Sequence, residues 1–357
     1  MASMASGNYF EPFANISECH ILDLPNEMIY TILAQTTLED VLSVRSTSTR
    51  FRAVTNLLNV VRVILRVYKC DIVCKFKNIT TSDKLGITTS DTGKVLLCQS
   101  KSVLAIDMKT GKIDTIASTF WNPKGIAYDR DGSVVIADAG HDIIVRIGVS
   151  GKKRTIAGIR KTSGYVNGKK CLLDEPRGMA FDKKGNLIFC DAYNNRIRQL
   201  SRDGFVSKVA GSGNSNNVNE TVCTRKAGFS YPEFICIDHR NGDIYIVDFS
   251  CDHSASTIRL IKNGKVYPIL IAGKNNVPRI INGLAISSRG HLYFMANGVF
   301  KVFKECGIQH VIRLKITREV KQNITNYSGL CYCNNALYFI GNHGDAAAPA
   351  KLYRINL

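Results

Sequence analysis

The sequence predicts a chain of two parts, a small all-α module followed by a large all-β domain made of six repeated sheets. Between about residues 21 and 67 the apolar residues recur at helical spacing. After about residue 70 they form short runs broken by Gly, Asn and Asp, as strands and tight turns require. One pattern then returns six times. A length of 357 residues agrees with roughly two domains of about 150 residues each.

The composition sets limits on both parts. An apolar fraction of 45% is too high for a disordered chain, and no run reaches the length of about 18 apolar residues that a membrane helix needs. Residues 1–15 lack the basic and apolar regions of a secretory signal, so we expect residues 1–20 to form a flexible segment. We therefore expect a protein that is not secreted and does not bind a membrane, located in the cytoplasm or, alternatively, the nucleus.

Most of the twelve cysteines stand inside apolar runs, as Cys98 and Cys190 do. In a reducing compartment such residues are buried thiols. None of them forms the Cys-x-x-Cys pair of a structural zinc site. The sequence therefore predicts neither a disulfide framework nor a metal site, and no cofactor.

The helical module begins with Pro25, which suits a first helical turn because its missing N–H has no partner there anyway. Thr37 and Asp40 have the spacing of a capping box for a second helix. Ser48 or Thr49 can cap a third. These helices total only about 40 residues, too few for a self-sufficient core, so they need a partner surface.

The stretch from residue 21 to 54 reads ILDLPNEMIYTILAQTTLEDVLSVRSTSTRFRAV and resembles an F-box. The resemblance implies docking on a Skp-type adaptor, which links the chain to a cullin. The residues that would contact the adaptor are Leu24, Pro25, Ile29, Ile32, Leu33, Val41, Leu42 and Val44. Thr36 and Thr47 depart from the usual pattern at positions where apolar residues are common. A helical cap on the following domain is the alternative.

The six repeats have marker positions 39, 53, 56, 49 and 46 residues apart, obtained by subtracting the residue numbers. The markers are Gly86, Gly125, Gly178, Phe234, Gly283 and Gly329. Each repeat contains an apolar run, a tight turn, a second run, a polar loop and an alternating third run, and a fourth run closes most of them. Four short antiparallel strands at such a period are typical of a β-propeller blade.

Repeats two and three resemble NHL repeats most closely. The third reads PRGMAFDKKGNLIFCDAYNNRIRQLSRDGFVSKVAG, with the Pro-x-Gly opening, the Asp after the second strand and the Asn-Arg-Ile-Arg third strand of that family. The last repeat ends after three strands, and the run 71–79 can supply its fourth. We therefore expect an NHL-like six-bladed β-propeller over residues 70–357, closed by strand 71–79 and preceded by the F-box-like module at 21–67.

The formal net charge of +18 lies entirely on the propeller. Residues 1–69 hold six Lys/Arg and six Asp/Glu, which leaves 47 − 6 = 41 against 29 − 6 = 23 for the rest. Two long loops, 158–176 and 211–232, carry cations and aromatic residues on the predicted loop face. The candidate partner-binding residues are Arg160, Lys161, Lys169, Lys170, Arg177, Tyr193, Arg196, Arg225, Lys226 and Tyr231. A solvated basic surface is the plainer interpretation of the same charges.

Some six-bladed propellers are lactonases or lyases with a metal in the central channel. Here Asp138, Asp191 and Asp248 recur at one repeat position, which indicates a structural role because an active site would break the symmetry. The seven His residues are scattered, and no nucleophile motif is present. We therefore expect a non-catalytic chain.

Together the two resemblances predict a substrate-recognition subunit of a Skp–cullin–F-box ubiquitin ligase that binds its substrate through the propeller. Its partners would be the adaptor, the cullin and an acidic protein substrate. The alternative is a propeller that binds RNA, or scaffolds proteins, with a helical cap; a lactonase or lyase ranks below both. Phosphates would bind the Lys and Arg residues and unstacked bases would lie on the aromatics.

Overall fold

The computed structural model describes residues 67–76, 86–215, 220–271, 277–305, 308–316, 324, 326–342 and 349–357. The chain divides into two units, Met1–Arg62 and Val63–Leu357, and every described residue belongs to the second. The segment 1–20 and the helical module predicted at 21–67 lie outside the described residues, except for Val67. The eight predicted adaptor contacts, Leu24 to Val44, therefore lie outside them too.

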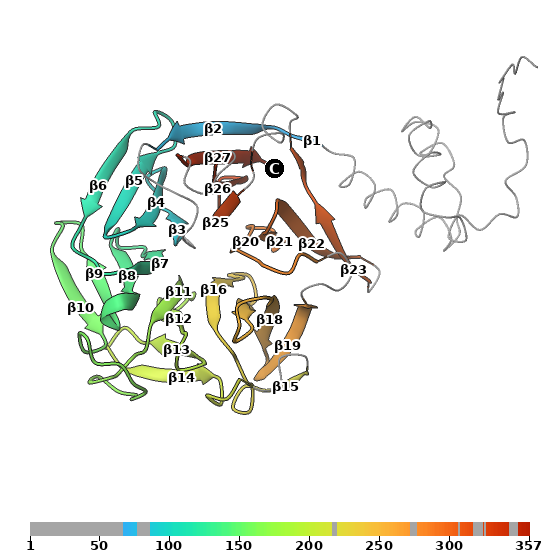
Figure 1. Ribbon diagram of the computed structural model, residues 1–357. Coiled ribbons are helices and arrows are strands. Elements are labelled where there is room, and N and C mark those ends of the chain that lie inside the picture. The colour runs from blue at the N-terminus through green and yellow to red at the C-terminus, as the bar shows by residue number, and fades with distance from the viewer. Residues whose placement is uncertain are drawn as a thin grey trace, which may run out of the picture. The chain divides into compact units, whose positions relative to one another are not determined.

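Six antiparallel sheets follow one another around a ring, which confirms the predicted six-bladed β-propeller (Figure 1). Blade 1 contains β3 (Ile87–Thr89), β4 (Lys94–Gln99), β5 (Ser102–Asp107) and β6 (Ile113–Ala117). Blade 2 contains β7 (Pro123–Tyr128), β8 (Val134–Asp138), β9 (Ile143–Ile147) and β10 (Lys153–Ala157), with the short 3₁₀ helix η2 (Ala139–His141) between β8 and β9. Blade 3 contains β11 (Pro176–Phe181), β12 (Leu187–Asp191), β13 (Arg196–Leu200) and β14 (Val206–Ala210).

The other three blades depart slightly from this pattern. Blade 4 contains β16 (Pro232–Ile237), β17 (Ile244–Phe249), β18 (Ser256–Lys262) and β19 (Lys265–Ile271), and β15 (Val222–Cys223) adds a fifth strand. Blade 5 contains β20 (Gly283–Ile286), β21 (Leu292–Met295), β22 (Val299–Glu305) and β23 (Ile308–Arg313). Blade 6 contains β25 (Asn326–Cys333), β26 (Ala336–Asn342), β27 (Lys351–Asn356) and β2 (Cys70–Lys75). A separate parallel pair joins β1 (Val67–Tyr68) to β24 (Lys315–Ile316).

The sixth blade combines strands from both ends of the propeller sequence. Strand β2 pairs antiparallel with β27, from Cys70 opposite Ile355 to Lys75 opposite Lys351. An ion pair between Arg354 and Asp71, 3.0 Å long, joins the same two strands. Because β2 comes from the start of the domain, its pairing holds the ring closed at this blade.

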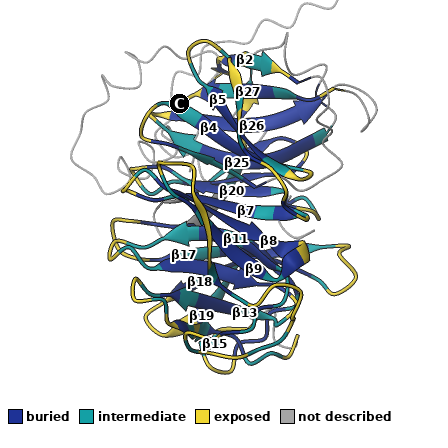
Figure 2. Ribbon diagram, turned by 90° about the vertical axis from the view of Figure 1, so that its left-hand side faces the viewer, coloured by how far each residue is buried: buried dark blue, intermediate teal, exposed yellow. Residues whose placement is uncertain are grey.

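Hydrophobic clusters lie between neighbouring blades all around the ring. The second strands of blades 2 and 3 are buried throughout, whereas the outermost strands β6 and β10 carry exposed residues, as do the turns and loops (Figure 2). Ten cysteines are free thiols among the described residues, and burial raises the pKa of several, including Cys98 and Cys236. Among the helices of the described residues, none is long and apolar enough to cross a membrane.

The marker glycines stand where the innermost strands of adjacent blades converge. A Cβ atom on Gly125 would lie 2.0 Å from the carbonyl oxygen of Arg177, and one on Gly178 would lie 2.4 Å from that of Glu233. Real Cβ atoms do not approach backbone so closely, so these positions need glycine for close packing rather than for an unusual backbone angle. The repeated Pro-x-Gly opening is thus a consequence of ring geometry.

Candidate partner-binding face

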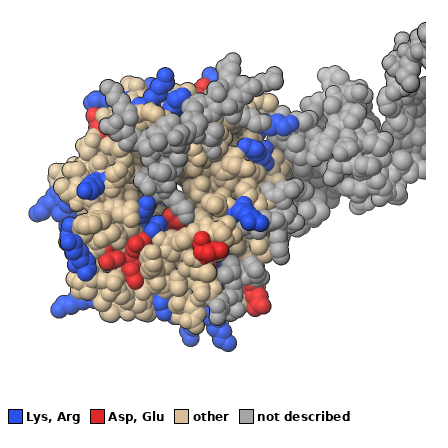
Figure 3. All heavy atoms as spheres, viewed as in Figure 1, with Lys and Arg blue, Asp and Glu red and all other residues tan. Residues whose placement is uncertain are grey.

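The face of the ring that carries the loops after the second and fourth strands is called the loop face below. Figure 3 shows it with acidic side chains toward its middle and Lys and Arg spread around its rim. The connections that build it include β4–β5, β6–β7, β8–β9, β10–β11, β12–β13, β14–β16 and β17–β18. Long loops on a rigid scaffold are where propellers and similar folds place binding residues.

Three buried aspartates at the ends of second strands hold these loops in place. Asp138 accepts a hydrogen bond from the backbone N–H of Trp121 at 2.7 Å, Asp191 from that of Asp174 at 2.8 Å, and Asp248 from those of Ser230 and Tyr231 at 3.0 and 2.9 Å. Each carboxylate thus fastens the incoming loop of its own blade. The structural role predicted for the three residues is confirmed by these contacts.

Each aspartate also has a basic partner within its blade. Asp191 pairs with Arg198 at 2.7 Å, Asp248 with Arg259 at 3.3 Å, and Asp138 with the ring of His141 at 2.7 Å. Burial nevertheless raises the pKa of all three carboxyl groups, and that of Asp248 reaches about 6. The free-energy cost of removing these carboxylates from water is therefore larger than the favourable interaction with their basic partners.

The only tryptophan of the chain is held at the surface of the loop face. The β6–β7 connection bends sharply at Thr119 and Asn122, both of which have a positive φ (74° and 65°). Gly140 donates its N–H to the carbonyl oxygen of Trp121 at 2.8 Å, and a Cβ atom on Gly140 would lie 2.4 Å from the indole Cδ1. The backbone and ring of Trp121 are therefore positioned by η2, yet 59% of the residue is exposed.

A lysine and a histidine lie beside this ring, and an arginine contacts the histidine. His141 meets Trp121 edge-on with the ring centroids 5.7 Å apart, and the Nζ of Lys161 lies 5.6 Å from the indole centroid. The guanidinium of Arg160 contacts Nε2 of His141 at 2.7 Å, which assigns the imidazole proton to Nδ1, where it is donated to Asp138. A fixed, exposed aromatic ring beside a cation is the kind of residue that anchors protein interfaces.

A second group of side chains lies around Arg177, nearer the axis of the propeller. Its guanidinium donates to Glu175 at 2.7 Å and to Glu233 at 2.9 Å, and it stacks 4.7 Å from the ring of Tyr231. Tyr231 meets Tyr193 edge-on at 5.3 Å between centroids. Tyr193 is 56% exposed, so it offers a second aromatic contact on the same face.

Three residues that we expected to bind a partner directly are instead committed to contacts within the protein. Arg177 and Tyr231 are buried. Arg196 donates to the carbonyl oxygens of Asn194 and Ser212 at 2.6 and 2.9 Å and stacks 3.9 Å from the ring of Tyr165. These side chains position the loops, because two carboxylates neutralise Arg177 and backbone oxygens occupy Arg196.

The remaining predicted cations are exposed but are distributed over different places. Arg160 and Lys161 lie beside Trp121. Lys169 stands at the outer rim, because the neighbouring Gly168 pairs with Val206 of blade 3, and Lys170 follows it. Arg225 and Lys226 follow β15 on blade 4. The loop face is therefore not one continuous basic patch, as Figure 3 also shows.

Sequence reasoning missed an acidic group on this face. Asp142 accepts the backbone N–H of Glu175 at 3.0 Å. Burial, together with the charges of Asp142, Asp191 and Glu175, raises the pKa of Asp174 to about 6. The adjacent Asp-Glu pair just before the third repeat was the available signal, but only the fold brings Asp142 to it.

The described lining of the central channel is mostly glycine and apolar residues. The small cavity there, about 50 Å³, is lined by glycines and apolar side chains, and Lys124 is the single titratable residue among its lining. In the part of the chain that the structure describes, no group of three or more His, Cys, Asp or Glu side chains could hold a metal ion.

The N-terminal region matches a known protein family. The model of the F-box domain matches residues 21–62, the region in which the sequence predicts helices. No curated protein matches the sequence in a direct search.

Several solved structures resemble the propeller. A gluconolactonase from Xanthomonas campestris aligns with a TM-score of 0.58 and 13% identity over 84% of this chain and 92% of its own. A streptogramin B lyase aligns with a TM-score of 0.52 and 17% identity over 81% and 98%. A chain of the nidogen/laminin complex aligns with a TM-score of 0.53 and 16% identity over 74% and 98%. At such identities the likeness shows a shared propeller fold.

Proposed function

We propose that this chain, an F-box protein with a six-bladed β-propeller, is the substrate-recognition subunit of a Skp–cullin–F-box ubiquitin ligase. The observation that carries the proposal is the F-box match at residues 21–62 in a chain whose remainder is a propeller. The F-box would bind a Skp-type adaptor and through it a cullin. The propeller would hold an acidic protein substrate, which raises the effective concentration of its lysines near the charged ubiquitin carrier.

The loop face supports a protein substrate. Interface cores are enriched in aromatic residues and Arg, and Trp121, Tyr193 and Arg160 lie exposed on this face. Because Asp138 and Gly140 already hold Trp121 in place, its burial by a partner would cost little conformational entropy. Neither these anchors nor the channel lining calls for catalysis by this chain, and we propose that the ligase partners supply it.

Adaptor binding tests the first half of the proposal. Pro25→Ala combined with Leu33→Ala removes two apolar residues of the F-box and should abolish co-purification of the full chain with a Skp-type adaptor. Trp121→Ala is the matched control, because it truncates an apolar residue of the propeller, and it should leave the adaptor bound. If the unaltered chain retains no adaptor, the F-box is not used in this way and the helical-cap interpretation replaces it.

Partner capture tests the loop face. We expect Trp121→Ala to weaken substrate capture at least about tenfold, since a buried Trp anchor commonly contributes 2 kcal/mol or more. Val149→Ala, at an 81% exposed valine in the turn between β9 and β10, is the control and should capture substrate normally. Equal capture by the two variants would remove Trp121 from the interface.

RNA is the second candidate ligand, favoured by the cation–aromatic pair of Lys161 and Trp121 together with the charge of +18. An RNA-binding propeller should retain RNA at low salt and lose it steeply as salt rises. Retention of a protein partner with no RNA would decide for the substrate receptor.

Three further proposals rest on sequence alone. The repeats are of the NHL type, which the Pro-x-Gly openings and the recurring Asp support. The domain bounds are 1–20, 21–67 and 70–357. The protein acts in the cytoplasm or the nucleus, where ubiquitin ligases of this class have their substrates.

A further inference from the structure

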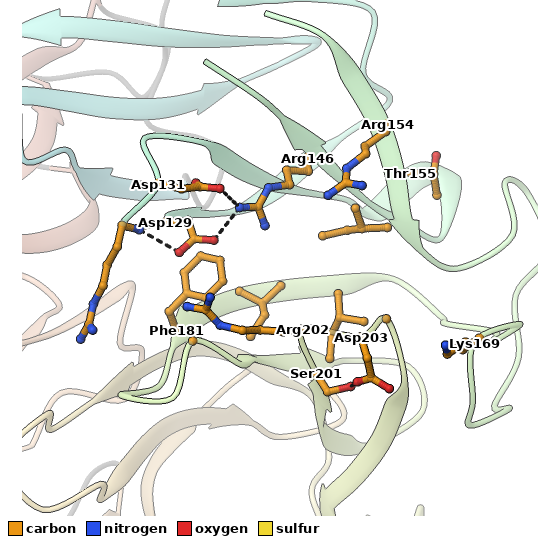
Figure 4. A pocket seen from close by; sticks show the side chains of 16 residues that line it. Asp129, Asp131, Arg146, Arg154, Thr155, Lys169, Phe181, Ser201, Arg202 and Asp203 are labelled. Carbon is orange, nitrogen blue, oxygen red and sulfur yellow. Dashed lines mark hydrogen bonds and ion pairs between the residues drawn. The ribbon is translucent and has the colours of Figure 1, made fainter. Parts of the chain in front are cut away.

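A groove of about 770 Å³ lies at the outer rim between blades 2 and 3, apart from the loop-face aromatics (Figure 4). One wall is formed by β10 and by Arg146 of β9, and the other by the turn between β13 and β14. Lys169, at the tip of the long loop, stands at one end. The volume falls within the usual range for ligand-binding sites, about 300 to 1,000 Å³.

The charge of the groove is positive and only partly neutralised. Five Lys or Arg residues and three Asp residues line it. A single cation, Arg146, pairs with two of the three acids: Asp129 at 2.7 Å, and Asp131. The third, Asp203, accepts a hydrogen bond from Ser201 of its own turn. The charge of Lys169 also acts on Asp203, and the five cations of the groove exceed its three carboxylates by two.

Three of these cations are available to a ligand. Arg154 points into the groove from β10, and Arg202 lies along the opposite wall (Figure 4). The Nε of Arg202 donates to the carbonyl oxygen of Lys184 at 3.1 Å, which fixes its guanidinium against the turn at Gly185. Arg154, Lys169 and Arg202 form no ion pair with any described residue.

The floor between the charged walls is apolar. Leu187 and Leu200 are buried, while Ile156 and Phe181 are half-buried at the edge of the hydrophobic cluster between blades 2 and 3. A ligand that reaches this floor would remove apolar surface from water, which favours binding. The groove therefore suits a ligand with both negative charges and apolar side chains.

The groove also follows the free edge of a strand. Three successive residues of β10, Arg154, Thr155 and Ile156, line it. A β-bulge between Thr155 and Ala157 interrupts the usual alternation of side chains, so neighbouring residues of this edge strand can line one groove. Among the described residues, β10 pairs with β9 on one side and with nothing on the other.

This protein already extends one blade in such a way. Strand β15 pairs antiparallel with the outermost strand of blade 4, with Val222 opposite Val266 and Cys223 opposite Lys265. Blade 2 has the same four-stranded arrangement without the added strand. An extended peptide is thus the ligand whose backbone, charges and side chains all match the groove.

We propose that the groove between blades 2 and 3 binds an extended acidic peptide, which pairs with the free edge of β10 and presents carboxylates to Arg154, Lys169 and Arg202. Its apolar side chains rest on the floor near Ile156 and Phe181. The site does not include Trp121 or the F-box, so it can hold true whether or not the loop face binds a substrate.

Binding of defined peptides to the full chain tests the charge requirement. A fluorescent peptide of alternating Glu and Val should bind, and the Gln–Val peptide of equal length should bind at least about tenfold more weakly. Arg154→Gln with Lys169→Gln should weaken the Glu–Val peptide at least about tenfold and leave the circular dichroism spectrum unchanged. Lys101→Gln with Lys109→Gln, two exposed lysines of blade 1, is the charge-matched control and should bind normally.

N-methylation of the peptide tests the pairing with β10. An extended strand presents alternate N–H groups to opposite edges, so methylating one alternate set should abolish binding and methylating the other should not. Equal tolerance of both sets would overturn the strand pairing. Equal binding of the Glu–Val and Gln–Val peptides would overturn the proposal, as would binding of a single-stranded RNA in place of both.

Discussion

At the scale of single residues, the protein uses buried carboxylates as fasteners for its loops. Asp138, Asp191 and Asp248 occupy one repeat position, and each accepts backbone N–H groups from the loop that enters its blade. Burial disfavours the ionised form of these carboxyl groups and so raises their pKa values. The loop face is therefore pre-organised at the expense of stability, a common arrangement at binding sites.

The raised pKa of Asp248 predicts a particular pH dependence of stability. Its pKa is about 6 in the folded chain and its ordinary value is 3.8, so the folded state binds the proton more tightly between these values. Stability from this group is then full below about pH 4 and is lost as the pH rises to about 6, by up to roughly 3 kcal/mol. Unfolding of the wild type and of Asp248→Asn by urea should show the wild type losing stability relative to the variant over this window.

A carboxylate with the opposite shift provides the control. Hydrogen bonds from Ser250 and Ser254 lower the pKa of Asp252 to about 2. Its stabilising contribution is present above the ordinary pKa of 3.8 and is lost as the pH falls toward about 2, so the difference in stability between wild type and Asp252→Asn should stay nearly constant between pH 4 and 6. A flat difference between wild type and Asp248→Asn would mean that Arg259 keeps Asp248 ionised throughout.

At the scale of elements, the innermost strands determine how tightly the blades meet. Gly125 of β7 contacts the backbone of β11, and Gly178 of β11 contacts that of β16. A small, mostly apolar cavity lies at the axis between these strands. The blade edges at the rim are used differently, since β15 extends blade 4 while β10 leaves blade 2 open.

Substitution of an inner-strand glycine should therefore destabilise the ring. In Gly125→Ala the new methyl group meets the carbonyl oxygen of Arg177 at 2.0 Å, and the two strands must move apart. We expect a loss of about 1 to 3 kcal/mol, as for other overpacked sites, measured by urea unfolding. Gly148→Ala is the control, because its nearest neighbour would lie at 3.9 Å and its stability should be nearly unchanged. Equal stability of the two variants would show that the strands adjust freely.

At the scale of the whole molecule, the ring depends on residues from the start of the propeller sequence. Strand β2 completes blade 6 through its pairing with β27, and Phe76 is buried next to it in the cluster between blades 6 and 1. Without β2, the edge of β27 would be open to other chains. The closing strand therefore protects the ring as well as stabilising it.

Two truncations test this dependence. A chain that begins at residue 77 lacks β2 and Phe76, and should lose more than about 3 kcal/mol of stability, the cost of removing one large buried side chain alone. It should also aggregate. A chain that begins at residue 67 keeps both and should unfold near the temperature of the full chain. Similar unfolding temperatures for the two would mean that β2 is dispensable.

Much of the fold could be predicted from sequence because its signals are local and repeated. Alternating apolar runs, tight turns and six spaced markers predict six four-stranded blades, and the structure confirms that architecture. The recurring aspartates could be interpreted as structural for the same reason. The F-box resemblance is likewise carried by a short continuous motif, which the domain match at residues 21–62 supports.

The candidate site was less predictable because charge on a loop does not reveal what that charge contacts. Arg177 and Arg196 are of the residue type that often binds ligands. However, Arg177 forms an ion pair with Glu233, and Arg196 donates a hydrogen bond to the backbone of Ser212. Trp121 was not singled out, since its position depends on a contact with Gly140 in another loop.

The blade count, the F-box and the location of the excess charge follow from the amino-acid sequence alone, because each depends on consecutive residues or on their repetition. The tertiary structure decided which cations are free and which are neutralised. It also decided that Lys169 joins Arg154 and Arg202 at the rim between two blades. The physical reason is that a charge is neutralised by whatever lies within a few ångströms, and in a closed ring those neighbours come from other blades.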